Sequence, residues 1–165
     1  MSRIITNSTP IIGLSILGKI DLLCDIFDEV FVPEGVYKEI VFSDSVNDYG
    51  KTELNKMIDV GKILLRKVEN RNLVRKLYGK LHEGELEVIV GAKELNIGIV
   101  AIDEKAARTL AKTFQLRPIG TVGILIIAKD RGLIKEVRPL LDKLIGYNFF
   151  ISKAIYHHAL ELADE

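Results

Sequence analysis

The sequence of 165 residues has one cysteine, no tryptophan, four prolines and no net charge. A single cysteine, Cys24, excludes an intramolecular disulfide framework and is typical of a reducing compartment. No apolar run approaches the roughly 18–20 residues that a membrane-spanning helix needs. The N-terminus MSRIITNSTP lacks the pattern of a secretory signal. We therefore expect a cytoplasmic protein without a membrane segment, folded as a single domain over residues 1–165.

Several common site chemistries are also missing. The sequence has no G-x-G-x-x-G after its first predicted strand, no G-x-x-x-x-G-K-[ST] and no G-x-S-x-G. Cys24 lies in the apolar run IDLLCDIF without a neighbouring Lys, Arg or His, which predicts a buried and inert thiol. His157 and His158 are adjacent on a predicted helix, so they point in different directions and form a poor chelating pair. A carboxylate cluster that holds a hard divalent cation remains the best-supported chemistry.

Charge is balanced overall but unevenly distributed. Residues 1–60 carry 5 basic and 10 acidic side chains, residues 61–143 carry 17 and 10, and residues 144–165 carry 1 and 3. The middle of the chain could present a basic surface to nucleic acid, or its charges could form an ordinary mixed surface. The single glutamine and the abundant Ile, Lys and Glu favour a thermophilic or archaeal source.

Short β-rich runs alternate with helical patterns along the chain. Strands are predicted over residues 3–6, 30–32, 63–68, 99–102 and 117–119. Helices are predicted from Pro10, with Thr9 as N-cap, and over residues 33–40, 51–60, 71–81, 84–95, 104–114, 121–130, 134–145 and 152–163. The turn-rich segment from Ser43 to Gly50 predicts a surface loop. This alternation predicts an α/β domain, a three-layer sandwich with a mainly parallel sheet flanked by helices.

Polar residues at the ends of the predicted strands are the candidates for a site, because parallel sheets bind ligands beyond their carboxyl ends. Asn7 follows the first strand and Asp103 follows the all-apolar strand IVAI. Glu39 and Glu85 lie on predicted helices. Each has a structural alternative: Asp103 could cap the next helix, Glu85 could complement a helix dipole, Glu39 could form a surface ion pair, and Asn7 could cap a turn. Only their joint occurrence indicates a site.

Five segments stand in the order found in one family. They are ITNSTPIIGLSILGKIDLL, VPEGVYKEI, LHEGELEVIVGAKEL, AIDEKAARTLAK and GTVGILIIAKDRGLI, and the tail FFISKAIYHHALELA also fits. Together they cover essentially the whole chain. The sequence therefore resembles the PIN-domain nucleases, most closely a prokaryotic PIN-like branch found in archaea and bacteria.

The resemblance implies a metal-dependent ribonuclease that uses Mg²⁺ or Mn²⁺. Many relatives are toxins of toxin–antitoxin operons and homodimers are common, so RNA, an antitoxin protein and a second copy are the implied partners. The catalytic and metal-binding centre of the family falls on Asn7, Glu39, Glu85 and Asp103. Thr121, in GTVG, matches a small hydroxyl residue near the same pocket. Ser8, next to Asn7, is expected to line it as well.

This chain departs from the family pattern in two places. Asn7 stands where the family normally has Asp, and Ala101 stands where many relatives have Thr or Ser. Asn7 would keep the shape of the site but remove one negative charge. Two alternatives therefore stay open: a degenerate PIN-like domain that binds RNA or a partner protein without cutting, and an unrelated small α/β binding module.

Nucleic-acid contacts are expected on the helix that follows Asp103. Arg108 and Lys112 are four residues apart, so they share a face of this helix, and Lys105 flanks that face. Contacts between such side chains and phosphates would position RNA without reading its sequence. Alternatively, these residues only pair with surface acids.

Overall fold

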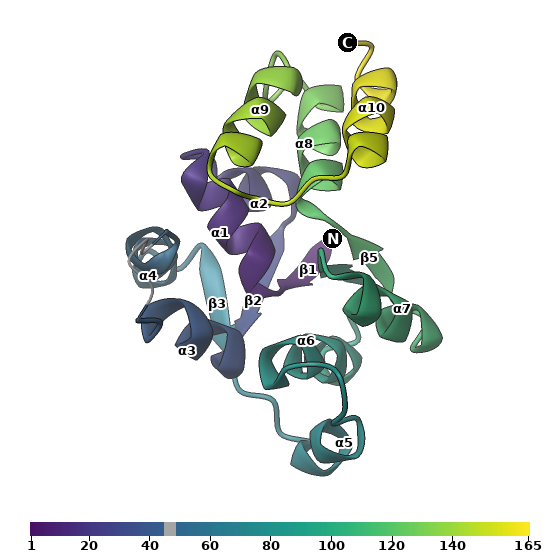
Figure 1. Ribbon diagram of the computed structural model, residues 1–165. Helices are drawn as coiled ribbons and strands as arrows, with labels where there is room; N and C mark the ends of the chain where they lie inside the picture. The colour runs from purple at the N-terminus through teal and green to yellow at the C-terminus, as the bar shows by residue number, and fades with distance from the viewer. Residues whose placement is uncertain (45–48) are drawn as a thin grey trace.

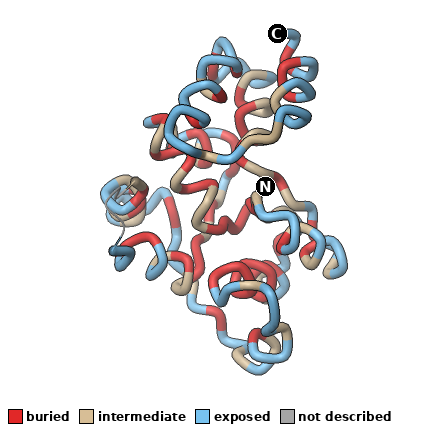
Figure 2. Tube along the Cα trace, viewed as in Figure 1, coloured by how far each residue is buried: buried red, intermediate tan, exposed pale blue. Residues whose placement is uncertain are grey.

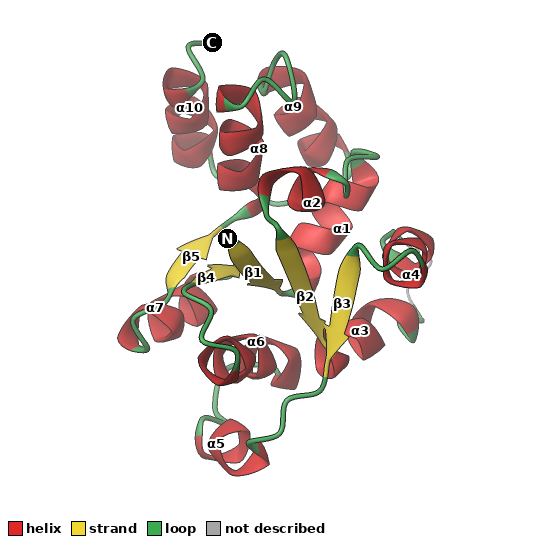
Figure 3. Ribbon diagram, turned by 180° about the vertical axis from the view of Figure 1, so that it is seen from behind, coloured by secondary structure: helices red, strands yellow, loops and turns green. Residues whose placement is uncertain are grey.

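The computed structural model of the chain describes residues 1–44 and 49–165. Its centre is a five-stranded sheet with the order β3-β2-β1-β4-β5, in which every pair of neighbours is parallel (Figures 1 and 3). The strands are β1 (Arg3–Thr6), β2 (Glu29–Pro33), β3 (Ile63–Arg66), β4 (Ile99–Ala101) and β5 (Arg117–Ile119). The predicted α/β class and the parallel central sheet are confirmed.

The central strands are apolar because both faces of the sheet are covered. Ile4 and Ile5 of β1 and Val100 of β4 are fully buried, as parallel strands under helices require. β1 pairs with β2 on one side and with β4 on the other, with Ile5 opposite Phe31 and Val100. Chain segments that are far apart in the sequence are therefore joined at the middle of the sheet.

Helices form the outer layers. On one face α6 packs on β1, β2 and β4, α7 packs on β5, and α5 lies against α6. Towards the other face α1 and α2 contact α8, which also contacts α10 (Figures 1 and 3). The helices are α1 (Ser8–Ile16), α2 (Leu22–Ile26), α3 (Glu34–Val41), α4 (Lys51–Asp59), α5 (Arg71–Lys76), α6 (Glu83–Glu94), α7 (Lys105–Thr113), α8 (Thr121–Asp130), α9 (Arg138–Gly146) and α10 (Lys153–Leu162).

Several helix boundaries differ from the sequence prediction. The N-cap of α1 is Asn7 and not Thr9, so this helix starts directly where β1 ends. α2 was not predicted, because five residues are too few to show a helical period. α5 ends at Lys76 and α9 starts only at Arg138, so both are shorter than predicted. The predicted loop from Ser43 to Gly50 lies partly outside the described residues.

Burial follows the sheet and the helix that covers its centre. Figure 2 shows buried residues along the strands and along α6, which is buried from Gly84 to Ala92. Two glutamates, Glu85 and Glu87, are among those buried residues. Buried carboxylates are rare unless they are paired or serve a function. The residues that contact Glu85 and Glu87 therefore indicate which of these two reasons applies to each. Among the described residues, no helix is long and apolar enough to cross a membrane.

Candidate functional site

Asn7 lies at the point where the order of the sheet reverses. β1 has β2 as its neighbour on one side and β4 on the other. The chain continues from β1 to β2 and then β3, and it returns to the other side of β1 to form β4. The carboxyl ends of two such strands leave a crevice between their connections. The backbone N–H of Asn7 donates to the carbonyl of Ala101 at 3.0 Å, so the residue is fixed between β1 and β4.

The side chain of Asn7 is buried, with an exposed fraction of only 1%. Its Nδ2 donates to Glu104 Oε2 at 3.2 Å, whereas its Oδ1 is buried and has no hydrogen-bond partner among the residues that the structure describes. The reverse amide orientation would bring Oδ1 against a carboxylate oxygen, and two acceptors would face each other. A buried carbonyl oxygen without a donor costs free energy, and it is a position where water or a cation would be bound favourably.

Glu104 is the site residue that the sequence did not single out. It is the N-cap of α7, its side chain is exposed, and it faces the start of α1. Oε2 accepts from Asn7, and Oε1 accepts from Thr9 Oγ1 at 2.8 Å. The only signal in the sequence was that Glu104 follows Asp103 directly. Two adjacent acids at the end of a strand point in different directions, and periodicity cannot decide which one faces the crevice.

Glu85 lies in the first turn of α6, where it could also serve only to complement the helix dipole. Its Oε2 accepts the backbone N–H of His82 at 3.0 Å, yet its exposed fraction is only 6%. Burial raises the pKa of Glu85 above its ordinary value, against the hydrogen bond from His82, and the negative charges of Glu104 and Glu39 raise it further. The residue therefore combines the capping role with a place among like charges.

Glu39 reaches the same region from α3. Glu39 is exposed, and its carboxylate lies against the first turn of α6, where a Cβ atom at Gly84 would be 2.9 Å from Glu39 Oε1. α3 and α6 contact each other although they are separated by more than forty residues in the sequence. Glu39 and Glu85 are thus brought together by the packing of these two helices.

Asp103 contacts the start of α8. Its Oδ1 accepts the backbone N–H of Thr121 at 2.8 Å, and its Oδ2 accepts Thr121 Oγ1 at 2.7 Å. The N-cap of α8 is Gly120, which has no side chain to cap the helix, so Asp103 supplies that acceptor instead of capping α7. Burial raises the pKa of Asp103, and the two hydrogen bonds from Thr121 oppose this shift.

The two expected pocket residues lie next to Asn7 and Asp103, and the expected nucleic-acid residues lie along α7. Ser8 is half-buried as the first residue of α1, and Thr121 is buried against Asp103. Lys105 and Lys112 are exposed on α7. Arg108 is only half-exposed, and its Nη1 donates to the carbonyl of Ile102 at 2.9 Å. Arg108 therefore supports the backbone at the end of β4, which is a structural role that the sequence did not predict.

We call Glu39, Glu85, Asp103 and Glu104, together with Asn7, the acidic cluster. Among the described residues, none of its four carboxylates has an ion-pair partner within 4.0 Å. Carboxylate and amide oxygens are the donors that Mg²⁺ and Mn²⁺ prefer, and the unpartnered Asn7 Oδ1 fits such an ion. The ligand set is not closed, because the described residues contain no group of three acidic, His or Cys side chains placed to hold a metal.

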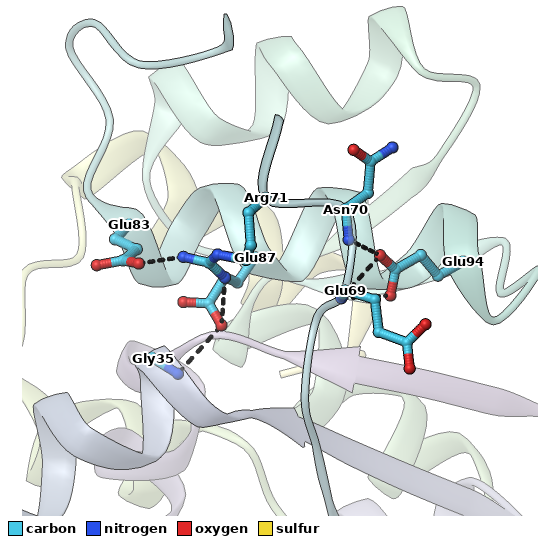
Figure 4. Close-up of polar contacts among 7 residues, drawn as sticks. All are labelled: Gly35, Glu69, Asn70, Arg71, Glu83, Glu87 and Glu94. Atoms are coloured by element: carbon cyan, nitrogen blue, oxygen red, sulfur yellow. Dashed lines mark hydrogen bonds and ion pairs between the residues drawn. The ribbon is translucent and has the colours of Figure 1, made fainter. Parts of the chain in front are cut away.

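A second polar group lies on the same helix pair (Figure 4), and we call it the arginine cluster. Arg71 of α5 forms ion pairs with Glu83 and, at 3.5 Å, with Glu87. Glu87 Oε1 also accepts the backbone N–H of Gly35 at 3.3 Å. Beside this cluster, Glu94 accepts the backbone N–H groups of Glu69 and Asn70, which holds the start of α5 against α6.

The groups that the sequence excluded from chemistry behave as expected. Cys24 is half-buried, and burial raises the pKa of its thiol to about 11, so it is not a reactive thiolate at neutral pH. His157 and His158 are exposed on α10. None of these three residues belongs to the acidic cluster.

Comparison with known proteins gives one finding on family membership. Residues 3–165 match a family model described as a PIN domain. A search of curated proteins gave no match. The family model covers nearly the whole chain and agrees with the parallel sheet and with the resemblance found in the sequence. The chain therefore belongs to the PIN-domain family.

Proposed function

We propose that this protein is a metal-dependent endoribonuclease whose active site is the acidic cluster. The observation that carries the proposal is the buried, unpartnered Oδ1 of Asn7 beside carboxylates that lack ion-pair partners among the described residues. Of the four carboxylates, Glu85 is buried, and a buried acid without a paired cation costs stability. Their position at the switch point of a parallel sheet is where this class of fold binds ligands.

Each residue of the cluster has a distinct part in the proposed reaction. Bound Mg²⁺ or Mn²⁺ would supply an activated water and neutralise charge on the phosphate oxygens. Asn7, Glu39, Glu85 and Asp103 would hold the ion through oxygen atoms. Glu85 uses Oε2 for the N–H of His82, which leaves Oε1 to hold the ion. Asp103 would also keep Thr121 in place.

The substrate that we propose is RNA, because the family resemblance implies it and α7, which begins directly after Glu104, carries two exposed lysines, Lys105 and Lys112. We extend the proposal to a toxin of a toxin–antitoxin pair that acts as a homodimer. A neighbouring gene for a small DNA-binding antitoxin would support that role. Co-expression with its product should then abolish RNA cleavage.

One observation favours a second candidate, a PIN-like domain that binds RNA without cutting it. Asn7 replaces the first acid of the family, and its amide already donates to Glu104. This hydrogen bond neutralises part of the carboxylate without any metal. Such a site would be stable but would attract a divalent cation weakly.

A cleavage assay separates the two candidates. End-labelled single-stranded RNA is incubated with the protein in Mn²⁺, in Mg²⁺ and in EDTA, and RNA binding is measured in EDTA by fluorescence anisotropy. A ribonuclease cuts only with metal, and Glu85→Gln abolishes cutting whereas the remote, exposed Glu161→Gln does not. Binding in EDTA without cleavage under any metal condition would establish the second candidate instead.

A further inference from the structure

The hydrogen bond between Asn7 and Glu104 carries an inference that rests on the proposed function and goes beyond it. We propose that Glu104 supplies the carboxylate that Asn7 lacks, and that the Asn7 amide holds Glu104 in place until a divalent cation binds. The missing negative charge is thus moved from the end of β1 to the N-cap of α7, and the charge of the site is conserved.

The first support is the position of Glu104. Its two carboxylate oxygens are held by Asn7 Nδ2 at 3.2 Å and by Thr9 Oγ1 at 2.8 Å, both of which are neutral donors. No cation lies within ion-pair distance of Glu104 in the part of the chain that the structure describes. Its negative charge is therefore not paired with a cation and lies beside the Asn7 side chain, whose Oδ1 has no hydrogen-bond partner among the described residues.

The second support is the direction of the Glu104 side chain. An ordinary N-cap acid would interact chiefly with the N–H groups of its own helix, but the Glu104 side chain makes no such capping hydrogen bond. It is directed across to the start of α1 instead.

The third support is the different use of Asp103. Both of its oxygens accept hydrogen bonds from Thr121. A Cβ at Gly120 would lie 2.8 Å from Asp103 Oδ1, so the carboxylate is packed tightly against the start of α8. Of the two adjacent acids, Asp103 is fixed in position by the start of α8, whereas Glu104 is held by an amide and a hydroxyl that a cation could displace.

The test moves one carboxylate from Glu104 to the position of Asn7. Manganese affinity of the full chain is measured by calorimetric titration for wild type, Glu104→Gln, Asn7→Asp and the double variant Asn7→Asp/Glu104→Gln, with Glu161→Gln as a control for the loss of one remote charge. Glu104→Gln should weaken Mn²⁺ binding roughly tenfold or more. The double variant should restore it towards the wild-type value, because the number of carboxylates is the same.

A second readout needs no metal and no activity. Thermal unfolding in EDTA is measured for the same four proteins. Glu104→Gln should lower the melting temperature in the wild-type background, where a charge-assisted hydrogen bond is lost. In the Asn7→Asp background it should raise the melting temperature, because it relieves repulsion between two carboxylates.

The outcomes are distinct. Unchanged Mn²⁺ affinity of Glu104→Gln in a wild type that binds Mn²⁺ would overturn the role of Glu104 and leave the proposed function intact. No Mn²⁺ binding by wild type or by Asn7→Asp would overturn the proposed function, and with it the metal-facing role of Glu104. Equal effects of Glu104→Gln on the melting temperature in both backgrounds would show that the two side chains do not interact, which also overturns the inference.

Discussion

The acidic cluster and the arginine cluster each contain one buried glutamate of α6 that lies near α3, yet the two glutamates have different surroundings. Glu85 and Glu87 lie two residues apart on α6, and burial raises the pKa of both. Around Glu87, Arg71 and the N–H of Gly35 oppose this shift. Around Glu85 the charges of Glu104 and Glu39 add to the shift, and His82 opposes it through its backbone N–H and its side chain.

We expect this difference to separate a structural acid from a functional one. The arginine cluster pairs the charge of Glu87 with Arg71, so it stabilises the contact between α3, α5 and α6. Glu85 has no ion-pair partner among the described residues, which in the proposed site would favour the binding of a cation. Neutralising Glu85 and breaking the arginine cluster should therefore have opposite effects on the stability of the protein in EDTA.

The largest effect is expected for Gly35→Ala in the arginine cluster. A Cβ at this position would lie 2.0 Å from Glu87 Oε2 and 2.9 Å from its Cδ, so the buried carboxylate must move away from Arg71. We expect the free energy of unfolding to fall by about 1–3 kcal/mol, measured by urea denaturation. Gly146→Ala is the matched control, because that helical glycine has open space around it and alanine should be neutral or slightly stabilising there. Equal stability of the two variants would contradict the tight packing of α3 on α6.

Arg71→Ala should lower the free energy of unfolding by about 1–2 kcal/mol at pH 7, because it leaves the buried Glu87 without a cation. The pKa of Glu87 would then rise further above its ordinary value. The deficit is present while Glu87 is charged, and it shrinks as the pH falls through that raised pKa. Denaturation at several pH values measures it. Arg75→Ala, an exposed position on the same helix, should have little effect; a deficit that does not change with pH would exclude Glu87 as its cause.

Glu85→Gln should stabilise the metal-free protein at pH 7, by up to about 1 kcal/mol. The folded-state pKa of Glu85 is raised above 4.5, so its charged form opposes folding above that pKa. As the pH falls towards 4.5 the wild type also becomes neutral there, and the two stabilities converge. Thermal melts in EDTA across this range measure the gap. Glu87→Gln should be less favourable, since it removes the ion pair with Arg71; an equal gain from both would break the distinction between the clusters.

The smallest effect is expected for RNA binding. Replacing Lys105 and Lys112 by Ala should weaken binding to all sequences and reduce the salt dependence by about 0.7 in log–log slope for each lost phosphate contact. Anisotropy titrations at several salt concentrations measure it. The control is the double variant Lys38→Ala/Lys67→Ala, which removes the same number of positive charges beside the arginine cluster. It should weaken RNA binding much less if RNA lies over the acidic cluster. Equal losses from both pairs would mean that the lysines act only through net charge.

The fold was predictable because its signals are strong and local. Fully apolar strands such as the one ending at Ala101, separated by helical patterns, leave few alternatives to a parallel sheet. The misplaced boundaries lie where local signals are weak: α2 has five residues, and Pro139 in the first turn of α9 did not reveal that the preceding residues are not helical.

The candidate site was predictable only in part. Asn7, Glu39, Glu85 and Asp103 were expected from the family pattern, and their roles in catalysis remain predictions. Glu104 was missed because its importance depends on the direction of a side chain. The hydrogen bond from Arg108 to the carbonyl of Ile102 was missed for the same reason, since helix spacing shows which face a residue shares but not what it contacts.

The strand order has a consequence for the growing chain. β1 is made first, but its pairing partner β4 is made about ninety residues later. Asn7 and Glu39 emerge early, whereas Glu85, Asp103, Glu104 and Thr121 emerge in the second half of synthesis. No fragment that stops before β4 can assemble the crevice, because its central strand lacks a neighbour on one side. In the proposed ribonuclease, the acidic cluster would therefore remain incomplete until β4 and the residues that follow it have been made.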